Sequence, residues 1–150
     1  MHVKTAQKRA ALEHLLRDAS LVRAIVFTRT KHGANKVNRQ LNSSGFVAEV
    51  IHGNKSQAAR QRALENFKSG DAWILVATDI AARGIDIRSV SHVFNYELPH
   101  EPESYVHRIG RTARAGAGGA AWALVDASEV GRLKAVQRFT KQTMERVTLD

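Results

Sequence analysis

Residues 74–87 read Ile-Leu-Val-Ala-Thr-Asp-Ile-Ala-Ala-Arg-Gly-Ile-Asp-Ile, an apolar run that leads directly into polar residues. Such a short run, rich in aliphatic side chains, is typical of a buried strand. Similar runs occur at residues 24–27, 47–51, 90–94 and 122–125, and amphipathic segments typical of helices lie at residues 7–18, 31–42, 57–68, 103–109 and 128–140. The alternation predicts an α/β fold in three layers, with a mostly parallel sheet of about five to six strands and helices on both faces.

Several residues mark the ends of the predicted helices. Gly45 and Gly70 are placed to stop two of them, and Ser56 is a good N-cap for the helix that begins at residue 57. Asp126 and Glu129 have the spacing of a capping box at the start of the last helix. Because ligands of such sheets bind at the carboxyl ends of the strands, the residues that follow each strand are the candidate site.

Composition narrows the class of protein. The 150 residues carry 23 Lys plus Arg against 14 Asp plus Glu, a net charge of +9, which suits one basic domain with an anionic partner. The sequence has no cysteine, which excludes disulfides and thiolate metal sites. The lack of cysteine fits a reduced, cytoplasmic setting, and the lack of an apolar run of about 18 residues predicts no transmembrane helix. The basic charge favours nucleic acid over a membrane as the partner, because no basic amphipathic stretch stands out. A merely basic, solvated surface is the alternative.

The common nucleotide-binding motifs are missing. The sequence contains no Gly-x-x-x-x-Gly-Lys-Ser/Thr, and no Gly-x-Gly-x-x-Gly follows the first predicted strand. It also lacks the His-Glu-x-x-His of zinc proteases. Any contact with a nucleotide must therefore come from arginines and backbone groups.

An arginine segment at residues 105–116 carries the strongest functional signal. Arg108, Arg111 and Arg114 repeat every three residues, and no acidic residue occurs from residue 104 to residue 125. Clustered guanidinium groups without a neighbouring carboxylate suit phosphate, and an inserted arginine stabilises the charge that spreads during phosphoryl transfer. The alternative is an exposed basic helix end that makes salt bridges at the surface.

Two further segments have functional and structural interpretations. After the third predicted strand, Thr78 offers a hydroxyl, Gly84 permits unusual backbone angles and Asp86 could accept from ribose hydroxyls, although Thr and Asp also serve as ordinary helix caps. In the helix that starts at residue 57, Gln57 and Arg60 share one face of the first turn. A cation there opposes the helix dipole unless an anion binds beside it. Pairing of Arg60 with a distant carboxylate is the alternative.

Together these segments resemble the second RecA-like domain of DEAD-box RNA helicases. Residues 26–31 are similar to motif IV of that family, residues 76–86 to motif V and residues 107–114 to motif VI. The segment at residues 52–57 is most similar to the bacterial RhlE-like subgroup. The resemblance runs from about residue 24 to residue 125 and implies a RecA-like fold.

The resemblance also implies roles for individual residues. Arg111 and Arg114 would be catalytic and contact the ATP γ-phosphate, with Arg114 as the arginine finger, while Gly84 and Asp86 would bind the nucleotide. His107 and Arg83 would couple the RNA and ATP sites. Six residues would hold the RNA backbone without regard to sequence: Thr28, Arg29, Gly53, Gln57, Arg60 and Thr78.

The sequence departs from the family pattern in two ways. Ala113 stands where many members have glycine, which we expect to matter little. The P-loop and the Asp-Glu-Ala-Asp motif of the first RecA-like domain are missing, so we expect a carboxyl half, inactive alone, whose main partners are RNA and that first domain. The cofactor would be ATP with Mg²⁺, the metal held mainly by the first domain.

Other partners and functions follow less directly. Ribosome-assembly or RNA-decay proteins are candidate further partners. A separate RNA-binding or protein-docking module without an ATPase role is the alternative function, and a DNA-directed superfamily 2 helicase fits the motifs less well.

Overall fold

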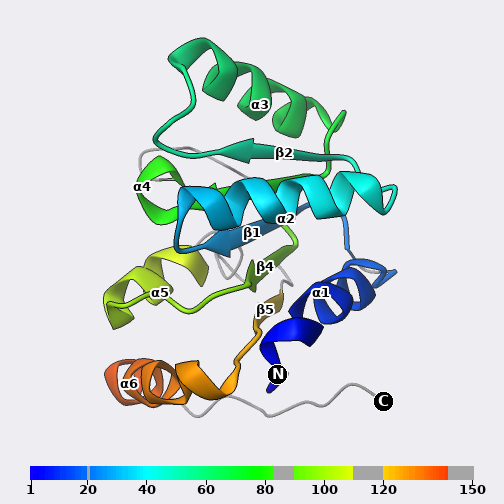
Figure 1. The fold of residues 1–150 in the computed structure, drawn as a ribbon. Coiled ribbons are helices and arrows are strands. Elements are labelled where there is room, and N and C mark those ends of the chain that lie inside the picture. The colour runs from blue at the N-terminus through cyan, green and yellow to red at the C-terminus, as the bar shows by residue number, and fades with distance from the viewer. Residues whose placement is uncertain (20, 83–89, 110–119, 142–150) are drawn as a thin grey trace.

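A computed structural model describes residues 1–19, 21–82, 90–109 and 120–141 (Figure 1). The strands are β1 (Ala24–Thr28), β2 (Ala48–Ile51), β3 (Ile74–Thr78), β4 (His92–Asn95) and β5 (Ala120–Ala123). The α-helices are α1 (Lys8–Leu16), α2 (Lys31–Ser43), α3 (Gln57–Ser69), α4 (Asp79–Ala82), α5 (Pro102–Ile109) and α6 (Val130–Thr140), and two 3-10 turns, η1 (Thr5–Gln7) and η2 (Ala127–Glu129), precede α1 and α6.

These strands form one parallel sheet in the order β2-β3-β1-β4-β5, which confirms the predicted α/β class. The central strand β1 is buried along its whole length, as is β3. Strand-to-strand connections in a parallel sheet must cross over, and here helices supply the crossovers. The carboxyl ends of the strands, which the sequence analysis identified as the candidate site, therefore lie at one edge of the sheet.

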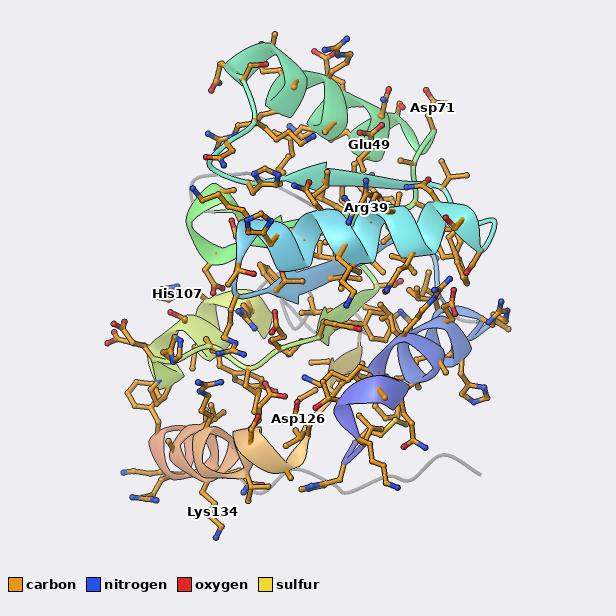
Figure 2. All side chains as sticks on the ribbon, in the orientation of Figure 1. Arg39, Glu49, Asp71, His107, Asp126 and Lys134 are labelled. Carbon is orange, nitrogen blue, oxygen red and sulfur yellow. The ribbon has the colours of Figure 1, made fainter. Side chains whose placement is uncertain are left out.

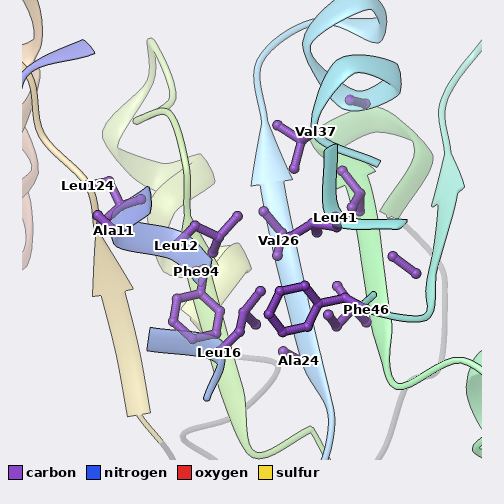
Figure 3. Close-up of a cluster of buried hydrophobic side chains, with 14 of the residues drawn as sticks. Ala11, Leu12, Leu16, Ala24, Val26, Val37, Leu41, Phe46, Phe94 and Leu124 are labelled. Carbon is purple, nitrogen blue, oxygen red and sulfur yellow. The ribbon is translucent and has the colours of Figure 1, made fainter. Parts of the chain in front are cut away.

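Helices cover both faces of the sheet. Alternate residues of β1 serve the two faces: Ala24 and Val26 pack with α1 and α2, whereas Ile25 and Phe27 pack with α3. Figure 3 shows the first of these clusters, with side chains of α1 and α2 meeting strand side chains around Val26. A third cluster joins α5 and α6 beside β5. The two main clusters hold the sheet rigid beneath the site.

The predicted helix ends are confirmed. Ser56 accepts a hydrogen bond from the backbone N–H of Ala59 as N-cap of α3, and Gly70 ends that helix with a φ of +90°. Such a left-handed conformation favours glycine. The capping box of Asp126 and Glu129 closes η2, directly before α6.

Two elements differ from expectation. The single-turn helix α4 follows β3 where a polar turn was expected. Strand β5 lies two residues before the predicted run at 122–125, because the four residues of β4 pair with residues 120–123 and β4 ends opposite Ala123. Val125 pairs instead with the N-terminal segment, donating its N–H to the Met1 carbonyl (2.8 Å) and accepting from Val3 (2.8 Å).

A buried ion pair ties the first helix to the last. Lys8 is 3% exposed, and its ammonium group donates to Glu129 and to the Tyr96 carbonyl oxygen (2.7 Å), with Asp126 3.7 Å away. Figure 2 shows Asp126 between η2 and the start of the chain. The second carboxylate oxygen of Glu129 accepts the Leu98 N–H (2.7 Å), so the pair also fixes the segment after β4.

The electrostatics of Asp126 reflect this network. Burial raises the pKa of its carboxyl, but hydrogen bonds from Ser128 and Thr5 and the charge of Lys8 outweigh burial. The pKa of Asp126 therefore lies below its ordinary value, and the carboxylate stays ionised beside Lys8.

Removing Lys8 tests the importance of this pair. We expect Lys8→Met to lower the free energy of unfolding by about 3–5 kcal/mol, because Glu129 would remain buried without its cation. Urea denaturation followed by circular dichroism measures the effect. Arg9→Met is the control, since Arg9 is exposed and its pair with Glu13 spans 3.8 Å, so that change should cost less than about 1 kcal/mol. If Lys8→Met and Arg9→Met lowered the free energy of unfolding by the same small amount, the buried ion pair of Lys8 would not stabilise the fold.

Candidate nucleic-acid interface

A cavity of about 870 Å³ opens at the carboxyl edge of the sheet. In Figure 1 the arrowheads of β1 and β2 point toward this edge, on the side where α4 and α5 lie. Segments that follow four strands line it: Arg29, Thr30, Lys31, His32, Asn35, Gly53, Asn54, Thr78, Asp79, Pro99, His100, Glu101 and Ser104. Of the six residues expected to hold RNA, three line this cavity: Arg29, Gly53 and Thr78.

The ends of β1 and β3 lie side by side here. The parallel register pairs Thr28 with Thr78. Thr78 lines the cavity, whereas Thr28 is fully buried and its hydroxyl donates to the Thr30 carbonyl oxygen (3.2 Å). A direct contact between the Thr28 side chain and RNA is therefore not available in this conformation. Thr28 instead shapes the turn that leads from β1 into α2.

Arg29 extends the wall of the cavity from the end of β1. Its Nη2 donates to Glu97 (3.1 Å), and its backbone N–H donates to the other carboxylate oxygen of Glu97 (3.1 Å). Its Nε is buried and has no hydrogen-bond partner among the described residues. The guanidinium group is thus held in place with part of its donor capacity unused.

The first turn of α2 faces the same space. Thr30 caps the helix by accepting from the Gly33 N–H (3.0 Å), and Lys31 and His32 line the cavity. The helix contains no acidic residue over its 13 positions. A helix N-terminus carries partial positive charge, which these side chains reinforce. The arrangement favours an anionic ligand.

Gln57 and Arg60 start α3 beside the cavity without lining it. Gln57 is exposed, and Arg60 is partly exposed with its Nη2 3.4 Å from the Ala81 carbonyl oxygen. The hydrogen bond described for Arg60 thus goes to a backbone oxygen, and its guanidinium group lies near the end of α4. This places a cation between α3 and the segment that follows β3.

The structure contradicts the expected surroundings of Arg108. The sequence predicted a guanidinium group without a carboxylate neighbour, but Arg108 is 1% exposed and makes a bidentate ion pair with Asp79, at 2.6 Å (Nε to Oδ1) and 2.8 Å (Nη2 to Oδ2). Its Nη1 donates to Asn95 (3.1 Å) and to the Glu97 carbonyl oxygen (2.6 Å). The guanidinium carbon lies 5.1 Å from the centre of the Phe27 ring. Arg108 therefore holds α5 against the sheet and is not free for phosphate.

The remaining site residues fall into two groups. His107 is exposed on α5 (Figure 2). Five expected residues lie outside the described residues, and no geometry is assigned to them: Arg83, Gly84, Asp86, Arg111 and Arg114.

Sequence reasoning missed Asp79, Glu97 and Asn35 as members of the site. Asp79 and Arg108 are 29 positions apart, so no local pattern joins them. An acidic residue directly after a strand, opposite an arginine-rich helix, was the one signal that could have suggested the pair.

Among the described residues, no helix is both long and apolar enough to cross a membrane.

Comparison with known proteins identifies the family. The profile of the helicase conserved C-terminal domain matches residues 7–116, and the chain belongs to this family. It is 48% identical over 153 aligned positions to the DEAD-box ATP-dependent RNA helicase CshA of Bacillus cereus, and 46% identical to the CshA of Bacillus subtilis. Both alignments take in the whole chain but only 29% and 31% of those proteins, so the chain spans less than a third of their length.

Solved structures agree with this assignment. The DEAD-box protein SrmB of E. coli, bound to the regulator of ribonuclease activity A, superposes with a TM-score of 0.89 at 38% identity, covering 98% of this chain and 88% of that one. A DEAD box protein from Methanococcus jannaschii gives 0.91 at 37% identity, covering 98% and 40%. The fold is therefore the RecA-like fold of DEAD-box carboxyl-terminal domains, and the predicted family is confirmed. The RhlE-like subgroup stays a prediction, because the curated relatives named here are CshA proteins.

The ion pair of Arg108 leads to a stability prediction. We expect Arg108→Lys to lower the free energy of unfolding by about 2 kcal/mol, because an ammonium group cannot match the carboxylate of Asp79 bidentately and also reach Asn95. Urea denaturation measures the change. Arg62→Lys on the exposed side of α3 should change it by less than about 0.5 kcal/mol. An Arg108→Lys protein as stable as the parent would show that the bidentate geometry contributes little.

Proposed function

We propose that this domain binds the RNA backbone at the cavity and that, joined to a first RecA-like domain, it forms half of an ATP-dependent RNA helicase. The observation that carries the proposal is the cavity itself, because it gathers Arg29, Gly53 and Thr78 from three separate segments at one edge of the sheet. The names of the relatives, ATP-dependent RNA helicases, point to the same activity.

The chemistry of the cavity suits a phosphate backbone. Lys31 and the α2 N-terminus supply positive charge. The carboxylates of Asp79 and Glu97 are paired with Arg108 and Arg29, respectively, and Glu101 also lines the wall. Hydroxyl and amide donors from Thr78 and Asn54 add hydrogen bonds that read no base sequence. Contacts of this kind give affinity that is independent of sequence and falls with salt.

The proposed ATP site depends on the segment after α5. Arg108 anchors this helix, and Arg111 and Arg114 follow it directly. Arg114 would act as the arginine finger and Arg111 as a second γ-phosphate contact, while Asp86 and Gly84 would hold the ribose. Bound ATP with Mg²⁺ supplies the reacting phosphate, and this domain stabilises the negative charge that develops on it. His107 and Arg83 would link this site to the RNA.

We further propose a cytoplasmic location and the first RecA-like domain as the principal protein partner. SrmB was crystallised with the regulator of ribonuclease activity A, and yeast Dbp5 with Gle1, so domains of this fold also bind other proteins. Proteins of ribosome assembly or RNA decay remain candidates for this chain.

The arginine finger can be tested by fusion. We expect no ATP hydrolysis by the chain alone, and RNA-stimulated hydrolysis once it is joined to the first RecA-like domain of a DEAD-box helicase. Arg114→Ala in the joined protein should lower kcat by about 10³-fold or more. Arg138→Ala, an exposed arginine on α6, is the matched control and should leave kcat unchanged. If Arg114→Ala binds RNA and hydrolyses ATP as fast as the parent, the finger assignment is wrong and a binding module is favoured.

RNA binding can be tested separately on α3. We expect Arg60→Ala to weaken binding of single-stranded RNA about tenfold, equally for different sequences, because a charged phosphate contact is lost. The slope of log affinity against log salt should fall by about 0.7. Arg62→Ala on the same helix is the control, since a residue two positions further lies on another side of the helix. Fluorescence anisotropy over a salt series measures both, and equal behaviour of the two variants would remove Arg60 from the site.

A further inference from the structure

His52 is a buried side chain next to two residues that line the cavity. It follows β2, is 3% exposed, and precedes Gly53 and Asn54, which line the cavity. Its ring contacts two segments at once. The Nε2 atom lies 2.9 Å from Asn35 Oδ1 on α2, and the Nδ1 atom lies 3.2 Å from the backbone nitrogen of Asn54.

These contacts define the protonation of the ring. The Asn54 N–H can only donate, so Nδ1 of His52 must be the unprotonated acceptor. Nε2 therefore carries the hydrogen and donates to Asn35 Oδ1. Burial lowers the pKa of His52, and the charges of Lys55, Lys31 and His32 lower it further, which favours this neutral form.

Other hydrogen bonds close the same turn. The Lys55 N–H donates to the His52 carbonyl oxygen (3.0 Å), and Lys31 Nζ donates to Asn54 Oδ1 (3.0 Å). The turn after β2 is thus fastened to the first two turns of α2 through Asn35 and Lys31. His52 is the only one of these groups that contacts both the turn backbone and α2.

Gly53 lies at the exposed top of this turn. An added Cβ at this position would meet no atom within 4 Å, and its φ lies outside the left-handed region. Neither packing nor backbone strain therefore accounts for glycine here. The glycine leaves open space in which a ligand could approach the backbone closely.

We propose that His52 is a positioning residue for RNA binding: its Nδ1 atom fixes the Asn54 N–H and thereby holds the Gly53 backbone at the distance that an RNA phosphate requires. The inference rests on the proposed RNA-binding function and deepens it. His52 does not contact RNA; it acts through the turn that it contacts. Pre-forming the turn removes the cost of ordering it when RNA binds.

Two substitutions test separately the two hydrogen bonds of the His52 ring: the one that Nδ1 accepts and the one that Nε2 donates. In His52→Asn, the side-chain oxygen lies as many bonds from Cβ as Nδ1 does, and it can accept the Asn54 N–H in an Asx turn. In His52→Gln, the amide nitrogen matches the position of Nε2 and keeps the Asn35 contact, but the acceptor near Asn54 is lost. Both variants lose the ring and its packing, so a comparable loss of stability is expected in each.

The experiment measures binding of a short fluorescein-labelled oligouridylate by anisotropy, with unfolding in urea measured in parallel. We expect His52→Gln to bind about tenfold more weakly than the parent and His52→Asn to bind within about twofold of it. Hydrogen exchange of the Asn54 amide should accelerate in His52→Gln and stay slow in His52→Asn.

Equal RNA affinity in the two variants overturns the proposal. If both bind weakly, His52 acts through packing alone; if both bind as the parent does, the turn needs no such support. The proposed function fails in a different way: the parent would then not bind the oligouridylate, or Arg60→Ala would leave its affinity unchanged. If the parent binds the oligouridylate, Arg60→Ala weakens that binding and His52→Gln leaves it unchanged, then the proposed function stands and only the role of His52 is wrong.

Discussion

The ion pair between Arg108 and Asp79 is the interaction on which the site depends. It joins α5, which follows β4, to the residue that directly follows the buried strand β3. Because Arg108 is almost fully buried, removing Asp79 would leave its guanidinium group poorly solvated and without its carboxylate. Thr78 is adjacent to Asp79 in the sequence, and Arg111 and Arg114 follow Arg108 within the arginine segment. The same contact therefore fixes α5 relative to the candidate RNA wall at the end of β3.

The rest of the cavity is built by a second set of polar contacts around α2. Asn35 and Lys31 reach from this helix to the turn after β2, and Thr30 caps the helix beside Arg29. The parallel register brings all these segments to one edge, but it does not fix their side chains. Buried polar groups such as His52 fix the side chains, because a buried donor or acceptor is stable only when it is hydrogen-bonded.

The sequence predicted the sheet and most of the site segments because their signals are local. Apolar runs, Ser56 as a cap and the spacing of Asp126 and Glu129 depend on neighbours within a few residues. The partner of Arg108 could not be predicted, because only the fold brings Asp79 to it. The family resemblance implied an RNA contact for Thr28, but its place in the central strand buries its side chain. The roles of Arg111, Arg114, Gly84 and Asp86 rest on the family resemblance.

The strand order also has a consequence for how this domain folds. Ala24 in the central strand pairs with Ile74 on one side and His92 on the other, so β1 gains its first strand neighbour only after about half of the chain is available. Non-local pairing of this kind slows folding, because long loops must close before contacts form. During synthesis β1 would stay an exposed apolar segment until β3 and then β4 emerge. Residues that end fully buried in the central strand thus wait for partners from much later in the chain.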